Sequence, residues 1–123
     1  MYGNRAQSYF ETNIMTADPK KLVLICYEGA IDYLNRGKKK YREGDYEGKA
    51  EALSKAREVI TELLSCLDFE KGGVIAKNLA ALYNYMLKRL LSADVNKDTE
   101  AVDEVLGMLA EMKAAWEQIS AEQ

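Results

Sequence analysis

Few side chains in this chain could perform covalent or metal chemistry. Cys26 and Cys66 could supply thiolate nucleophiles, and the carboxylates of Glu100, Glu104 and Glu111 recur at helical spacing. A thiol nucleophile usually needs a neighbouring histidine to accept its proton, and the sequence contains no histidine. The same absence removes the commonest general base and a usual metal ligand. The cysteines and carboxylates therefore do not predict a catalytic site.

The remaining site patterns also favour structural interpretations. Cys26 and Cys66 do not form a Cys-x-x-Cys pair, so we expect two buried free thiols rather than a metal site. The stretch EKGGVIAKN lacks the spacing and the Gly-Lys-Ser/Thr ending of a phosphate-binding loop. Acidic residues at helical spacing are typical of a solvated helix face. We predict that the protein is not an enzyme and uses no cofactor and no metal; a cytoplasmic enzyme of unknown type is the least favoured alternative.

The elements that position the remaining side chains are predicted to be helices. Hydrophobic residues make up 48% of the chain, charged residues 30%, and there is a single proline, which favours a folded all-α protein. The helices are expected over residues 19–42, 46–67, 74–93 and 99–121, with a hinge at 68–73 and a polar turn at 94–99. Asp45 is a suitable N-cap for the second helix, and either Asp98 or Thr99 can cap the last one. The short connections predict an antiparallel up-down four-helix bundle over residues 18–121, preceded by an N-terminal leader segment over residues 1–17.

The first and third predicted helices contain more apolar residues than a bundle core needs. A bundle helix requires one apolar stripe, about three positions in seven. The first helix has one stripe through Leu22, Ile25, Cys26, Ala30, Tyr33 and Leu34, and another through Val23, Leu24, Tyr27 and Ile31. The third has Ile75, Leu79, Leu82, Met86 and Leu90 on one face, with Tyr83, Tyr85, Leu87 and Leu91 beside it. The surplus surface could pack on the leader, on a partner helix or on a second copy in a homodimer.

Charge and hydropathy restrict the partners and the location. The formal net charge is −3, from 17 basic and 20 acidic residues, so there is no basic footprint for a nucleic acid. No apolar run approaches the ~20 residues of a membrane span, and the first residues lack the apolar core of a signal peptide. We predict a cytoplasmic protein without membrane insertion.

Several separated motifs match the pattern of one known family. The stretch TADPKKLVLICYEGAIDYL resembles the Thr-Ala-Ser-Pro-x-x-Leu-x-x-x-Leu-Tyr-x-Gly opening of the FliS family of flagellar secretion chaperones. Asp18 stands where that family often has serine, and Cys26 stands where it often has leucine. The segment LSKAREVITELLSCLDFEKGGVIAKNLAALYNYMLKRLLSAD is similar to the family's central region. LAEMKAAW resembles its closing Trp-containing helix. The motifs occur in the family's order along nearly the whole chain.

The resemblance implies a function without catalysis. A FliS chaperone binds the disordered C-terminal region of flagellin, prevents premature polymerisation, and delivers the complex to the gate of the flagellar type III export apparatus. A co-chaperone is a further partner that the resemblance leaves open. The leader would cover part of the client site in the free protein.

The family pattern also implies candidate site residues in this chain. The expected client-binding residues are Leu24, Tyr27, Ile31, Ile60, Leu64, Asn78, Leu82, Tyr83, Tyr85 and Met86. For Ile60, Leu64 and Leu82, plain core packing is at least as good an interpretation. The Asn78 amide could hydrogen-bond the client's backbone or serve equally well in an internal cap or network. The leader residues expected to cover the site are Tyr9, Phe10, Ile14 and Met15. Arg89 is expected to pair with a carboxylate, either on the client or within the bundle.

Overall fold

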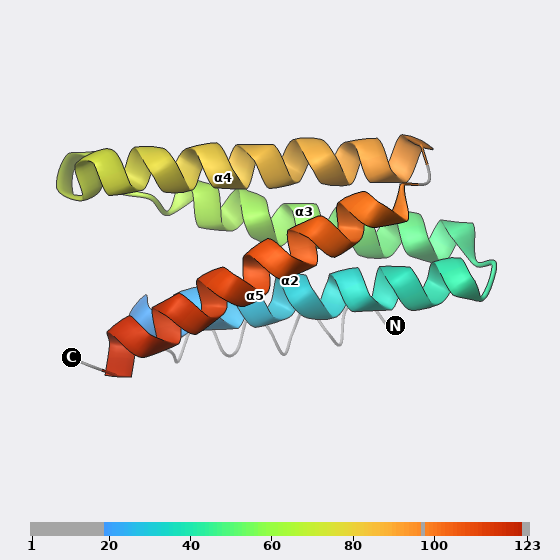
Figure 1. The fold of residues 1–123 in the computed structure, drawn as a ribbon, viewed down its shortest axis with the longest axis horizontal. Coiled ribbons are helices and arrows are strands. Elements are labelled where there is room, and N and C mark those ends of the chain that lie inside the picture. The colour runs from blue at the N-terminus through green and yellow to red at the C-terminus, as the bar shows by residue number, and fades with distance from the viewer. Residues whose placement is uncertain (1–18, 97, 122–123) are drawn as a thin grey trace.

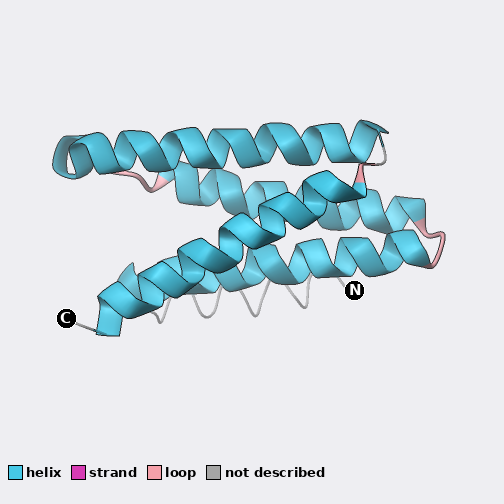
Figure 2. Ribbon diagram, in the orientation of Figure 1, coloured by secondary structure: helices cyan, strands magenta, loops and turns pink. Residues whose placement is uncertain are grey.

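The computed structural model describes residues 19–96 and 98–121, which form four helices (Figures 1 and 2). They are α2 (Pro19–Arg42), α3 (Tyr46–Ser65), α4 (Phe69–Asn96) and α5 (Thr99–Ala121). Consecutive helices run in opposite directions, and α3 and α5 each contact both α2 and α4. The predicted all-α four-helix arrangement is confirmed. The leader, with its four predicted covering residues, lies outside the described residues.

An aspartate side chain caps the N-terminus of three of the helices. The Asp45 carboxylate accepts a hydrogen bond from the Gly48 N–H at 2.8 Å, and the Asp98 carboxylate accepts one from the Ala101 N–H at 3.2 Å. Both caps were predicted. Asp68 likewise accepts from two backbone N–H groups at 3.0 Å. Because such a carboxylate satisfies N–H groups that have no partner inside the helix, it fixes where the helix begins.

The structure corrects the predicted limits of the third helix. The predicted segment was 74–93, whereas α4 begins at Phe69 and ends at Asn96. The predicted hinge at 68–73 is reduced to a local break at Gly73, where φ is 51° and ψ is −124°. Glycine adopts this backbone conformation because it has no Cβ. The predicted polar turn at 94–99 is shorter as well, since α4 extends through its first half.

One hydrophobic core receives side chains from all four helices. Its largest fully buried side chains are Leu34, Leu53, Ile60, Met86, Leu90, Val105 and Leu109. Within it the Tyr27 and Tyr83 hydroxyls form a 2.7 Å hydrogen bond between α2 and α4, and burial raises the pKa of both phenols. Cys26 is buried as predicted, but Cys66 is exposed because it follows the last residue of α3.

Two contacts join α5 to α2, one near each end of α2. Near the start of α2, the Trp116 indole N–H donates to the Lys20 carbonyl oxygen at 2.8 Å. Near the other end, the Lys38 ammonium lies 2.6 Å from the Asp103 carboxylate. Figure 1 shows the consequence: α5 starts beside the end of α4 and then runs diagonally away from it toward the start of α2.

Candidate functional site

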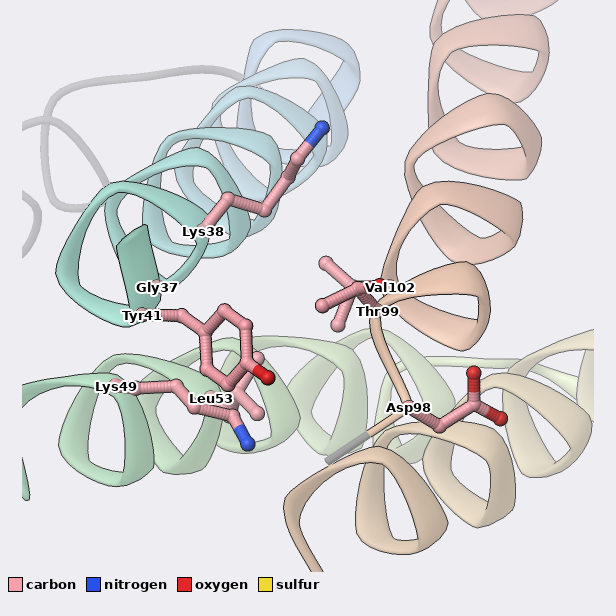
Figure 3. Close-up of a pocket in the computed structure, with 8 residues that line it drawn as sticks. All are labelled: Gly37, Lys38, Tyr41, Lys49, Leu53, Asp98, Thr99 and Val102. Atoms are coloured by element: carbon pink, nitrogen blue, oxygen red, sulfur yellow. The ribbon is translucent and has the colours of Figure 1, made fainter. Parts of the chain in front are cut away.

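A small cavity between α2, α3 and the start of α5 is too small for a ligand site (Figure 3). Its volume is about 10 Å³, the lower limit for one water molecule, whereas small-molecule sites occupy roughly 300–1,000 Å³. Beside it the buried Lys49 ammonium donates to the Ala93 carbonyl oxygen at 3.4 Å and lies 5.2 Å from the centre of the Tyr41 ring. Lys49 thus supports the negative end of the α4 dipole.

The described residues contain no other constellation suited to chemistry. Across 19–96 and 98–121, no three or more cysteine, aspartate or glutamate side chains gather closely enough to hold a metal ion. Burial raises the pKa of the Cys26 thiol to about 11, so little of it is thiolate near neutral pH. None of the described helices is long and apolar enough to span a membrane. A candidate functional site therefore has to be sought on the surface.

The apolar stripe of α4 is fully buried at one end, whereas at the other end two of its residues are exposed and Leu79 is only partly buried against the core. Leu90 and Met86 are fully buried, Leu82 is 40% exposed, and Ile75 is 71% exposed. The antiparallel pairing of Arg89 with Glu104 would place Ile75 opposite Gln118, two residues after Trp116. Trp116 instead bonds to α2, so α5 does not cover this half of α4. Of the two interpretations left open for Leu82, its exposure disfavours plain core packing.

Helical spacing places a set of exposed or partly exposed, mostly apolar residues on the sides of α4 and α5 that carry the Arg89–Glu104 contact, and this set is here named the α4–α5 face. The α4 residues of this face lie on the same side of the helix as Arg89, whose side chain contacts α5. The α5 residues lie on the same side of that helix as Glu104, and the two methionines among them are partly buried. The α4–α5 face comprises Ile75, Asn78, Leu82 and Tyr85 of α4 and Met108, Met112 and Ile119 of α5. Flexible methionine side chains suit a surface that adapts to a bound chain.

A chain of polar contacts closes this face at one end. The Tyr85 hydroxyl donates to one oxygen of Glu104 at 2.7 Å, and the Arg89 guanidinium donates to the other at 2.7 Å. Arg89 also lies 3.5 Å from the Asp98 carboxylate. The hydrogen bonds from Tyr85 and then Arg89 lower the pKa of the Glu104 carboxyl, and the bond to Glu104 raises the pKa of the Tyr85 phenol. Arg89 thus has carboxylate partners within the bundle, one of the two alternatives left open by the sequence.

A second exposed apolar pair lies on the other side of α4. Leu91 is 55% exposed and Val95 is 74% exposed. Leu91 lies two residues after Arg89, about 200° around the helix, and therefore faces away from α5. This pair, here named the outer flank, offers a comparison surface on the same helix.

The ten predicted client-binding residues occupy several places in the structure. Asn78, Leu82 and Tyr85 lie on the α4–α5 face, while Leu64 is partly buried against the core. The four in the core, which are at most 3% exposed, are Tyr27, Ile60, Tyr83 and Met86. A client could reach these four only if the core opened, so we retain the exposed residues as candidates for direct contact.

Leu24 and Ile31 lie on yet another side of the bundle. They are seven residues apart, and seven residues further along α2 is Lys38, which pairs with Asp103 of α5. Both therefore lie on the side of α2 that faces α5, where they are partly buried. They do not belong to the α4–α5 face.

The fold and the surface together define a class of protein. A small helical bundle with an uncovered apolar helix face is typical of proteins that bind another polypeptide. Comparison with known proteins is more specific. The chain matches the family described as flagellar protein FliS over residues 2–123, and it belongs to this family.

Curated relatives from several bacteria agree with this assignment. The flagellar secretion chaperone FliS of Salmonella typhimurium is 44% identical over 116 residues, covering 94% of this chain and 86% of that protein. FliS of Vibrio cholerae is 38% identical over 112 residues, covering 91% and 82%. FliSB of Pseudomonas aeruginosa is 32% identical over 125 residues, covering 98% and 99%. Each is named as a chaperone, which points to a non-enzymatic role for this chain.

Proposed function

We propose that this chain is a cytoplasmic export chaperone that binds the disordered C-terminal region of flagellin on the α4–α5 face. Binding keeps flagellin from polymerising early and allows its delivery to the flagellar type III export apparatus. The observation that supports this most directly is the α4 stripe, which is buried at Met86 and Leu90 but uncovered at Leu82 and Ile75. A client segment that packs on this half of α4 would complete the apolar layer.

Energetics favour an extended apolar surface for such a client. A disordered segment loses roughly 1–2 kcal/mol per ordered backbone residue on binding. Apolar burial returns roughly 25 cal/mol per Å², so about 1,000 Å² supplies some 25 kcal/mol before this cost is subtracted. Leu82, Ile75 and Ile119 are side chains of the type needed, and all three are at least 40% exposed.

The leader is the second part of the proposal. Tyr9, Phe10, Ile14 and Met15 would cover part of the client site while it is empty and would leave when the client binds. Removing residues 1–15 is then expected to strengthen client binding or to promote self-association. Unchanged affinity together with an unchanged oligomeric state would contradict the role of the leader.

Calorimetric titration with a peptide covering the C-terminal region of its own flagellin tests the client assignment. The expected result is 1:1 binding with a strongly negative heat-capacity change, the signature of apolar burial. Absence of binding to the folded protein, with and without its leader, would reject the assignment.

A homodimer is the competing explanation for the exposed face. It would bury Ile75 and Leu82 against a second copy of the chain, and light scattering across concentration would then show a stable dimer without client. A protein that stays monomeric alone and forms a 1:1 complex with the peptide favours the chaperone function.

A further inference from the structure

The polar contacts at the end of the α4–α5 face form a continuous chain. The Tyr85 hydroxyl and the Arg89 guanidinium donate to the two oxygens of Glu104, each at 2.7 Å. The second arm of Arg89 reaches Asp98, whose carboxylate accepts the N–H of Ala101 in the first turn of α5. The orientation of the Tyr85 ring is thereby tied to the start of α5.

This chain lies where α4 and α5 separate. Nearer the start of α4, Leu82 and Ile75 are exposed, and α5 contacts α2 through Trp116. Tyr85 is therefore a large aromatic side chain, 43% exposed, that borders the uncovered apolar residues. A single hydrogen bond through its hydroxyl restricts the ring before any client arrives.

We propose that Glu104 and Arg89 are positioning residues that hold the Tyr85 ring in place as a preformed contact of the client surface. This inference rests on the proposed function, which it extends to two residues that need not touch the client. Its physical basis is preorganisation: a side chain that is already ordered loses less conformational entropy when the client binds. Because one carboxylate serves both donors, Glu104 acts through Tyr85 and Arg89 together.

The structure also contains a matched interaction without this role. The Lys38–Asp103 ion pair joins α2 to α5 at 2.6 Å, and Asp103 directly precedes Glu104 in the chain. Both carboxylates are exposed and each links α5 to a neighbouring helix, but Asp103 pairs with α2 whereas Glu104 pairs with α4. If Glu104 only stabilised the bundle, neutralising Glu104 and neutralising Asp103 would change client binding to the same extent.

The test measures binding of a fluorescein-labelled peptide from the C-terminal region of its own flagellin, by anisotropy, to the full chain. The variants are Tyr85→Phe, Glu104→Gln, their double variant and the control Asp103→Asn. Tyr85→Phe keeps the ring on the surface and removes only the hydroxyl. Thermal unfolding of every variant separates a loss of stability from a loss of affinity.

The expected result is a roughly three- to tenfold increase in Kd for each single variant, the scale of ordering one aromatic side chain on binding. The double variant is expected to bind no more weakly than the weaker single variant, because both changes release the same ring. Asp103→Asn should stay within about twofold of the wild type.

Two outcomes overturn the inference while leaving the proposed function intact. In one, the wild type binds but Tyr85→Phe and Glu104→Gln bind equally well. In the other, their effects on the binding free energy add, so that Glu104 acts independently of the Tyr85 ring. If the wild type itself does not bind, the proposed function fails and the inference fails with it.

Discussion

Replacing the uncovered apolar residues of α4 should remove client binding without unfolding the protein. The perturbation is the double variant Ile75→Gln/Leu82→Gln, since glutamine has a helix propensity close to that of leucine. With Ile75 71% exposed and Leu82 40% exposed, the two residues together expose about one whole apolar side chain. Burying one such side chain contributes roughly 1.5–3 kcal/mol. A client that covers both should therefore bind the variant about 10- to 150-fold more weakly.

The assay is calorimetric titration with the flagellin peptide, combined with urea unfolding of each variant. Both side chains are exposed, so the free energy of unfolding should change by no more than about 0.5 kcal/mol per residue. The matched control is Leu91→Gln/Val95→Gln, which removes similarly exposed apolar side chains from the outer flank of the same helix. The control should keep nearly wild-type affinity.

Two results would refute the assignment of the α4–α5 face. One is an affinity of the Ile75→Gln/Leu82→Gln variant within about twofold of the wild type. The other is an equal loss in the outer-flank control, which would mean that exposed apolar surface matters but its position on α4 does not.

Three further measurements test the structure itself. Tyr27→Phe or Tyr83→Phe alone should destabilise the protein by roughly 1–3 kcal/mol in urea, because each leaves the other buried hydroxyl unpaired; the double variant should cost less than the sum of the two. The hydrogen bonds from α4 lower the pKa of the Glu104 carboxyl below its ordinary 4.5, so its stabilising contribution is present above that value and lost as pH falls through the folded-state pKa. The difference in urea midpoint between wild type and Glu104→Gln should accordingly shrink on acidification, whereas a pH-independent difference would contradict this role. Iodoacetamide at neutral pH should label the exposed Cys66 in the folded protein. Cys26 should stay unlabelled until the chain unfolds, because it is buried and its pKa is raised to about 11. Mass spectrometry of the two cysteine-containing peptides checks this order.

Local sequence signals were sufficient for the positions of most helices. Asp45 and Asp98 are caps in the structure because an aspartate before an amphipathic segment supplies the acceptor that the first N–H groups need. The start of α4 was placed too late because paired glycines usually end a helix. Here Asp68 caps the first turn of α4, which begins before the two glycines, and only Gly73 departs from helical backbone angles.

The candidate site could be predicted only in part. An excess of apolar residues on α4 was visible in the sequence, and Asn78, Leu82 and Tyr85 do lie on an exposed face. Tyr83 was expected beside the buried stripe but lies inside the core, where its hydroxyl meets Tyr27. Glu104 was considered only as part of a solvated helix face. Its partners lie 15 and 19 residues away on another helix, so no local spacing indicates the contact.

Residue types and their spacing along the chain were enough to predict amphipathic helices, to exclude histidine-dependent catalysis, and to reveal the resemblance to the FliS family. These properties depend on residue type and on spacing within one helix. The tertiary structure decided which of the apolar residues are exposed. Contacts between residues far apart in the chain, such as Trp116 with Lys20, draw α5 toward α2. One half of the α4 stripe is thereby covered, and in the other half Ile75 and Leu82 are left exposed.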